Sequence, residues 1–315
     1  MAHDTGGRGG RFRFPAFAPT RMMTPRPGER VDGRPIMVGL LCLALVGVGV
    51  LARTGIECLV GMAFPTGLWG LSAAGIRLAA SLLGTAVTVV CVILWCRLRE
   101  KRRYVRVGLS GRGIASECGI GALGGLILLA GAVGICTAGG GLDVMRGEHT
   151  PVGWVILFGL LFIVQGFSEE LLFRAHLMAG LSGTCPLWGC VVINASLFSL
   201  LHLFNSGIGV ISVINTFLFG VLMSLLVLRR GSIWMAGMVH AMWNFAEGCL
   251  FGGAVSGLHG APSVLVTVVR VDAPAYRFLC GGSYGPEGGL AVTVVLSLGL
   301  LAVVLWPTKR TERDL

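Results

Sequence analysis

Long runs of apolar residues, separated by short segments rich in arginine, glycine and proline, dominate the 315-residue sequence. An α-helix needs about twenty consecutive apolar residues to cross the hydrocarbon layer of a bilayer. The pattern therefore predicts an all-α fold, a polytopic transmembrane helical bundle of about eight spans. The predicted spans are residues 36–52, 78–96, 118–138, 152–180, 186–204, 209–228, 232–251 and 289–306.

The stretch 55–75 is ambiguous, because Glu57 and Pro65 interrupt its apolar pattern. It could form a re-entrant or interfacial piece, or a ninth span. With eight spans, the basic N-terminal segment, the basic loop at 97–106 and the C-terminus all lie on one side of the membrane. Cytoplasmic loops carry an excess of Lys and Arg, so eight spans with both termini in the cytosol fit the charge distribution better than nine.

The composition supports a membrane location, since 54% of the residues are hydrophobic and 13% are charged. A soluble domain carries about 25% charged residues, so an ordinary cytosolic enzyme is excluded. The net charge of +10 does not indicate nucleic-acid binding, because the basic residues cluster beside apolar runs instead of forming one compact surface. We expect a multi-pass protein of the cytoplasmic membrane that contacts lipid and no nucleic acid.

The organisation of the chain is asymmetric. Most of the ten cysteines lie inside apolar runs and no CxxC pair occurs, so neither a disulfide framework nor a zinc ribbon is predicted. The two halves show no matching interrupted segments of the kind found in transporters. The predicted parts are a flexible basic cytosolic tail at 1–35, an N-terminal transmembrane region at 36–140, a region with intramembrane polar residues at 152–251 and a C-terminal transmembrane helix at 289–306.

Ionisable residues inside a span indicate function, because an unpaired charge there costs several kcal/mol. The run GFSEELLFRAHL contains Glu169, Glu170 and Arg174. Glu170 and Arg174 stand at i and i+4, the spacing of a helical ion pair, with the acid in the favourable N-terminal position. Adjacent residues point about 100° apart, so Glu169 faces elsewhere and lacks a local cation. A carboxylate in that setting is a candidate general base.

The next polar groups lie on two later spans. His240 and Asn244 are also at i and i+4, so one helix face presents two donors suited to a developing oxyanion. His202 follows Phe198 by one turn. A helical hairpin that turns near 182–185 would bring Glu169 and His202 to similar depth, since they lie about 14 and about 18 residues from the turn. His176, late in its predicted helix, is interpreted as a hydrogen-bonded or interfacial histidine.

Three ordered motifs are intact on these helices: EExxxR at 169–174, FxxxH at 198–202 and HxxxN at 240–244. Together they resemble the CPBP family, which contains the type 2 CAAX prenyl endopeptidases and the bacterial bacteriocin-processing and immunity (Abi) proteins. The resemblance covers roughly residues 152–251. It implies an intramembrane catalytic domain that hydrolyses a membrane-presented peptide or protein, as in CAAX-type processing or bacteriocin maturation.

The resemblance also implies roles for the motif residues. Glu169 would activate water with help from His202, and His240 and Asn244 would hold the oxyanion of the tetrahedral intermediate. The structural support would come from Glu170, Arg174 and Phe198. Families of this kind have been called metalloproteases. The residue types permit zinc or another divalent metal, with Glu169, His202 and His240 as ligands, without requiring one.

Other mechanisms fit the sequence less well. No HExxH motif occurs, and the GxSG and GxSxG matches fall in loops of a chain with 50 glycines. The alternative function is a catalytically silent CPBP-like protein that acts as an immunity factor or scaffold; the intact Glu169 and His202 argue against it. A transporter that uses Glu169 as a proton relay is a third hypothesis, and the lack of repeats counts against it.

Overall fold

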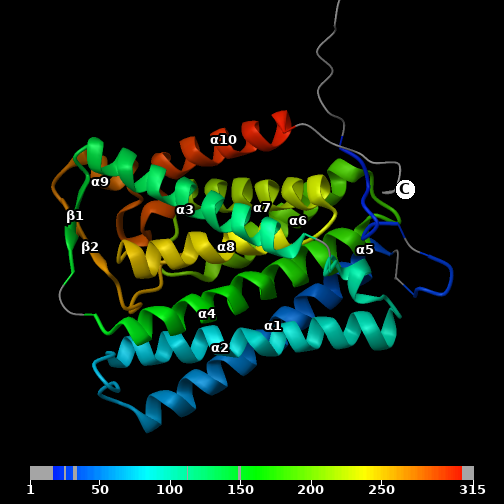
Figure 1. The fold of residues 1–315 in the computed structure, drawn as a ribbon, viewed down its shortest axis with the longest axis horizontal. Helices are drawn as coiled ribbons and strands as arrows, with labels where there is room; N and C mark the ends of the chain where they lie inside the picture. Colours follow the sequence, from blue (N-terminus) through cyan, green and yellow to red (C-terminus); the bar gives the residue numbers. More distant parts are fainter. Residues whose placement is uncertain (1–16, 25, 31–33, 112, 148–149, 307–315) are drawn as a thin grey trace, which may run out of the picture.

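The computed structural model describes residues 17–24, 26–30, 34–111, 113–147 and 150–306. Nearly all regular structure in these residues is helical (Figure 1). The helices are α1 (Pro35–Ala63), α2 (Ala73–Leu94), α3 (Ile114–Ala138), α4 (Val152–Glu170), α5 (Ala179–Leu181), α6 (Leu187–Leu201), α7 (Val210–Arg230), α8 (Trp234–Phe245), α9 (Pro274–Phe278) and α10 (Leu290–Leu305). π-Helical turns extend three of them: η1 (Trp95–Arg99) follows α2, η3 (Leu171–Met178) follows α4, and η5 (Ala246–Leu250) follows α8.

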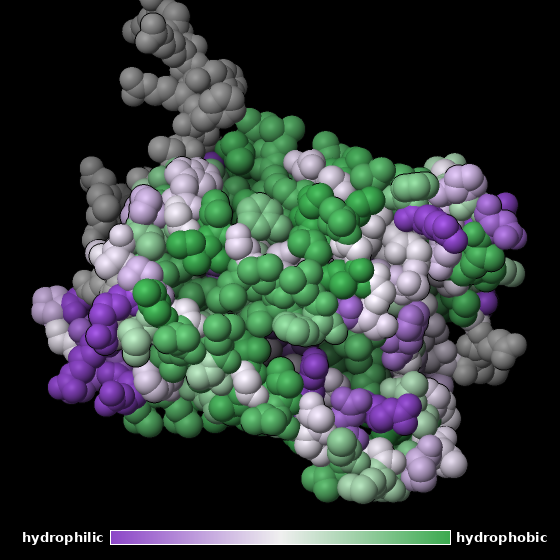
Figure 2. Space-filling model, turned by 180° about the vertical axis from the view of Figure 1, so that it is seen from behind, coloured by the Kyte–Doolittle hydropathy of each residue, from purple (hydrophilic) through white to green (hydrophobic). Residues whose placement is uncertain are grey.

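The helices form a polytopic bundle, as predicted. Within the described residues, six helices with their continuations are long and apolar enough to cross a membrane, and α10 is a shorter apolar helix. The remaining predicted span corresponds to α8 and η5, in the middle of the bundle (Figure 1). Figure 2 shows hydrophobic side chains gathered in a broad belt between hydrophilic ends. This distribution is the one expected of a multi-pass membrane protein.

The ambiguous stretch 55–75 forms neither a ninth span nor a re-entrant piece. Helix α1 continues to Ala63, so Glu57 is a half-buried residue within this 29-residue helix. Residues 64–72 then form a turn that a backbone bridge between Leu68 and Leu71 closes. Glu57 thus does not interrupt α1, and Pro65 lies just beyond the end of this helix.

The N-terminal segment is partly folded, which differs from the expected flexible tail. Residues 1–16 lie outside the described part of the chain. Met22 and Met23 are buried in the core, and Arg102 donates a hydrogen bond to the Met22 carbonyl at 3.2 Å. The arginine of the basic loop thus binds the chain that precedes α1, an interaction over 80 residues of sequence that local composition does not reveal.

Glu29 attaches the same segment to the basic loop. Its carboxylate forms an ion pair with the Arg106 guanidinium at 3.2 Å. Burial raises the pKa of the Glu29 carboxyl, but the hydrogen bonds from Arg106 and from the Arg26 backbone, together with the charges of Arg106 and Arg102, outweigh it and lower the pKa below its usual value. The pair is therefore ionised at neutral pH.

A two-stranded antiparallel sheet closes the end of the bundle opposite the basic loop. Strand β1 (Leu142–Arg146) pairs with β2 (Leu265–Val269), so that Leu142 lies opposite Val269. The two strands join the segment after α3 to the segment after η5 (Figure 1). The all-α prediction omitted them because they lie in the loops between apolar runs.

Glycines allow the helices to approach closely. Gly121 and Gly125 on α3 lie against the backbone of α8, where added Cβ atoms would meet the carbonyl oxygens of Met235 and Val239. Small residues at this i, i+4 spacing let membrane helices pack backbone to backbone. Because lipid provides no hydrophobic drive for helix association, such contacts are a main source of stability.

We predict that Gly125→Ala lowers the free energy of unfolding by roughly 1–3 kcal/mol, because the new methyl group would push α3 away from α8. Thermal unfolding in detergent measures the effect. Gly134→Ala, on the same helix with nothing within 4 Å of its added Cβ, is the control. Equal midpoints for the two variants would contradict the proposed packing.

Candidate functional site

The predicted ion pair between Glu170 and Arg174 forms at the centre of the bundle. The two side chains are fully buried, with 3.0 Å between Oε1 and Nη1. Arg174 Nη2 also donates to the Gly220 carbonyl of α7 at 3.1 Å. His240 of α8 donates from Nδ1 to the same Glu170 Oε1 at 3.0 Å. One carboxylate therefore joins α4 to α8 and, through Arg174, to α7.

Glu169 points to a different side, as helical geometry predicts. Its Oε1 accepts a hydrogen bond from Gln165 Nε2 at 2.7 Å. Its Oε2 lies 3.8 Å from His240 Nε2 and has no hydrogen-bond partner among the described residues. His240 thus lies between two glutamates, with one ring nitrogen toward each. Glu170 Oε2 also has no hydrogen-bond partner among the described residues, but Glu170 is fully buried and does not line the cavity, so Glu169 is the glutamate whose open oxygen a further ligand can reach.

Gln165 is a site residue that the sequence analysis missed. Its Oε1 accepts a hydrogen bond from Asn244 Nδ2 at 2.8 Å while its Nε2 donates to Glu169. The amide therefore connects Asn244 to the glutamate. The available signal was a polar residue one helical turn before Glu169 in an otherwise apolar run. Asn244, which we expected to help hold an oxyanion, already donates one of its two N–H groups to Gln165.

His202 lies where α6 ends. Its Nδ1 is 2.8 Å from the Phe198 carbonyl, which can only accept, so Nδ1 carries the proton and Nε2 of the neutral ring is the acceptor. The Phe198 ring lies 4.6 Å from the His202 ring and 6.2 Å from the His240 ring, and the Arg174 guanidinium stacks 4.9 Å from it. Phe198 thus lies beside the arginine and both histidines.

The four predicted site residues line one cavity of about 650 Å³. Glu169, His202, His240 and Asn244 meet there with Gln165. Another wall comes from α1 and α2, through apolar side chains, two threonines, one serine and one arginine. That wall is outside the region we expected to carry the catalytic domain. The wall side chains are Val46, Val50, Leu51, Arg53, Leu78, Ser81, Leu82, Thr85 and Thr88.

A second acid, Glu287, also lines this cavity. Both of its carboxylate oxygens accept hydrogen bonds, one from Trp243 Nε1 at 2.9 Å and one from Ser256 Oγ at 2.6 Å. These donors hold Glu287 in one orientation as an acceptor. The sequence analysis missed Glu287, because it lies outside the apolar runs, in the short 3-10 helix Pro286–Gly288 before α10. Its saturated environment contrasts with the open oxygen of Glu169.

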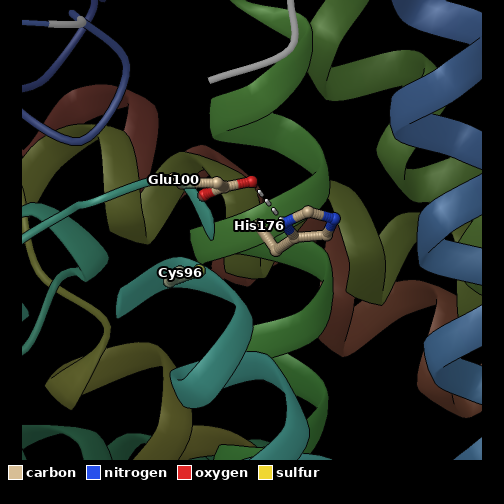
Figure 3. A group of neighbouring side chains, drawn as sticks. All are labelled: Cys96, Glu100 and His176. Atoms are coloured by element: carbon tan, nitrogen blue, oxygen red, sulfur yellow. Dashed lines mark ion pairs between the residues drawn. The ribbon is translucent and has the colours of Figure 1, made fainter. Parts of the chain in front are cut away.

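The candidate metal ligands do not gather as expected. Among the described residues, the ligand atoms of Glu169, His202 and His240 do not form a group close enough to hold one ion. The group that does so lies elsewhere: Cys96, Glu100 and His176 have donor atoms within 4.8 Å of one another (Figure 3). The three predicted ligands of the cavity are thus not grouped within 4.8 Å in the described part of the chain.

The comparison with known families gives one match. Residues 151–246 match the family described as type II CAAX prenyl endopeptidase, Rce1-like. This segment is therefore similar to the CAAX-protease (CPBP) family, and it is called the CPBP domain. It runs from the start of α4 to the start of η5 and contains all three motifs. The comparison with curated proteins found no match.

The CPBP domain occupies under a third of the chain, and the family implies a peptidase. Helices α1 to α3 and α10 lie outside the matched segment. Since α1 and α2 form a wall of the cavity, the matched helices make up only part of the site's surroundings.

We predict that Arg174→Met destabilises the CPBP domain by about 3–5 kcal/mol, because it leaves the buried Glu170 carboxylate without its cation. Unfolding in detergent, followed by thermal shift or by proteolysis, measures the loss. Glu169→Gln is the control and should change stability by less than about 1 kcal/mol.

A second variant tests the cause. Glu170→Gln combined with Arg174→Met removes both charges, so this double variant should be more stable than Arg174→Met alone. If the double variant is less stable than the single one, burial of an uncompensated charge is not the reason for the loss.

Proposed function

We propose that the protein is an intramembrane endopeptidase that hydrolyses a peptide bond presented to its cavity from the membrane. The observation that carries this proposal is the environment of Glu169. One oxygen is held by Gln165, the other has no hydrogen-bond partner among the described residues, and two histidines line the same cavity. A bundle that only needed stability has no use for an acid held in this way.

The proposed mechanism uses water as the nucleophile. Glu169 takes one proton from the water while the water oxygen attacks the carbonyl carbon. When the C–N bond breaks, Glu169 gives this proton to the leaving amine. His202, with Nε2 as an acceptor, orients the water. The hydrogen bonds from Gln165 to Glu169 and from Asn244 to Gln165 keep the carboxylate in its position during the reaction.

His240 and the remaining N–H of Asn244 would stabilise the oxyanion. Glu170 accepts the Nδ1 proton of His240 and fixes the orientation of the ring. With a proton also on Nε2, the ring can donate to the negatively charged oxygen of the intermediate. Donors held in place before the reaction contribute about 10²–10³-fold to the rate.

The cavity wall suggests a lipid-modified substrate. Aliphatic side chains of α1 and α2 line the same cavity as Glu169, together with the aromatic rings of Phe198 and Phe219. An isoprenoid chain would bury its apolar surface against these residues. We therefore infer CAAX-type processing, in which a peptide bond next to a prenylated cysteine is cleaved.

Orientation follows from the basic loop. The residues of 97–106 and the segment before α1 lie at one end of the bundle, which the positive-inside rule assigns to the cytosol. Glu169 lies about 13 residues before the turn at that end, roughly 20 Å along the helix. We infer that the substrate reaches the site through the depth of the bilayer in the cytoplasmic membrane.

Arg53 is the candidate anchor for an anionic group of the substrate. It lies in the middle of α1 and lines the cavity, and its Nε is buried without a hydrogen-bond partner. None of the carboxylates in the described part of the chain forms an ion pair with it. An intramembrane arginine without a counter-ion indicates a ligand. The terminal carboxylate of a CAAX peptide would provide a negatively charged counter-ion for Arg53.

We predict that Glu169→Gln and His202→Ala each lower kcat by roughly 10²–10⁴-fold without unfolding the protein. The assay uses the wild type in liposomes with a farnesylated peptide ending in Cys-aliphatic-aliphatic-X, and mass spectrometry detects the released tripeptide. Glu57→Gln, which changes a glutamate outside the cavity, should retain full activity. The unprenylated peptide tests the contribution of the lipid.

Full cleavage by the Glu169→Gln variant would overturn the assignment of the base. If the wild type cleaves neither peptide, then CAAX-type processing is wrong, and the silent immunity or scaffold function becomes the better explanation.

We also predict that Arg53→Met raises KM for the farnesylated peptide at least about tenfold and changes kcat less than about threefold, because the anchor binds a group remote from the scissile bond. Arg77→Met, at an exposed arginine of α2, is the matched control. A farnesylated peptide with a C-terminal amide should bind the wild type weakly. Its KM should be as high as the KM of Arg53→Met for the peptide with a free C-terminal carboxylate. An unchanged KM would contradict the anchor.

A further inference from the structure

Three side chains with metal-ligating atoms meet at the basic end of the bundle, outside the peptidase cavity. Cys96 lies on η1, Glu100 just after it, and His176 on η3 (Figure 3). Their donor atoms all lie within 4.8 Å of one another, and the three residues are 0%, 5% and 1% exposed. Two elements that are distant in sequence thus bring a thiol, a carboxylate and an imidazole to one enclosed point.

His176 is incompletely satisfied in this environment. Its Nδ1 lies 3.3 Å from Glu100 Oε1, and neither ring nitrogen has a hydrogen-bond partner among the described residues. Buried polar groups are nearly always hydrogen-bonded, so a buried imidazole whose one polar contact is an ion pair with Glu100 needs an explanation. A bound ion would occupy the lone pair of the one ring nitrogen that lies within 4.8 Å of the Cys96 and Glu100 donor atoms.

We propose that Cys96, Glu100 and His176 bind one divalent transition-metal ion, with zinc the best match. Thiolate, imidazole and carboxylate are the ligands that zinc takes in proteins, and a water molecule would complete a four-coordinate site. On binding, the Cys96 thiol loses its proton to solvent, and the thiolate and carboxylate together balance the two positive charges of the ion.

Neighbouring side chains already hold Glu100 in position. Arg102 Nη1 forms an ion pair with Oε2 at 3.2 Å, which leaves Oε1 toward His176. Trp95 Nε1 donates to Oε1 at 3.2 Å. Arg102 also donates to the carbonyl of Ala175, the residue before His176, at 2.9 Å. Hydrogen bonds of this kind to a ligating side chain hold it in the orientation needed for coordination and increase the affinity for the metal.

The position indicates a structural role. His176 follows Glu169 by seven residues, about two helical turns or roughly 10 Å along the axis. A metal here would join the end of α2 to the continuation of α4 and would stabilise the helix that carries the base. If so, metal found in the purified protein would not show that a metal takes part in the hydrolysis.

Zinc content of the full-length protein, purified in detergent from zinc-supplemented cells, tests the site. We expect about one zinc per chain in the wild type. In Cys96→Ser and His176→Ala, the zinc content per chain should fall at least about tenfold. Cys42→Ser, at another fully buried free cysteine, and Glu169→Gln should retain it. Retention by Glu169→Gln separates this outcome from the fate of the peptidase proposal.

Cobalt(II) provides a test that does not require the ligand variants to fold. Wild type and Cys42→Ser loaded with cobalt should both show thiolate-to-cobalt charge-transfer absorption. A folded wild type with neither stoichiometric zinc nor this absorption overturns the site. So does full retention of zinc by Cys96→Ser and His176→Ala, or loss of zinc from Glu169→Gln alone.

Discussion

A carboxylate enclosed in the hydrocarbon layer must be paired, and Glu170 meets this requirement with Arg174 and His240. Arg174 also donates a hydrogen bond to the Gly220 carbonyl of α7. Because these contacts hold α4, α7 and α8 together, they fix the ring of His240. Glu169, the next residue along α4, is then directed to the other nitrogen of that ring. The geometry of the site follows from a buried ion pair that does not itself line the cavity.

Close helix packing makes this ion pair feasible. Glycines on α3 lie against α8, and Gly166 on α4 lies against Ala241 of α8. Larger residues at these positions would separate the helices by more than the reach of a hydrogen bond. Several of the 50 glycines, which the composition alone could not interpret, therefore allow close helix contacts. The cavity also depends on α1 and α2, which the family match does not include.

The polar groups of the bundle divide into two layers with different chemistry. Around Glu169 they leave acceptors and donors directed into a cavity. Around Glu100 they enclose three potential ligands that do not line that cavity. The two layers share the continuous helix of α4 and η3, so the positions of Glu169 and His176 are coupled through its backbone. This arrangement separates a proposed hydrolytic function from a proposed structural metal.

The sequence by itself determined the spans, the three motifs and the pairing of Glu170 with Arg174, because helix length and i, i+4 spacing are local properties. It could not show that Gln165 would connect Asn244 to Glu169, nor that Glu287 and Arg53 would line the same cavity. Those contacts join segments far apart in the chain. The π-helical turns η1 and η3 also shift the helix phase on which face-based reasoning depends. Only the tertiary structure could therefore place Cys96 beside His176 and turn isolated polar residues into sites.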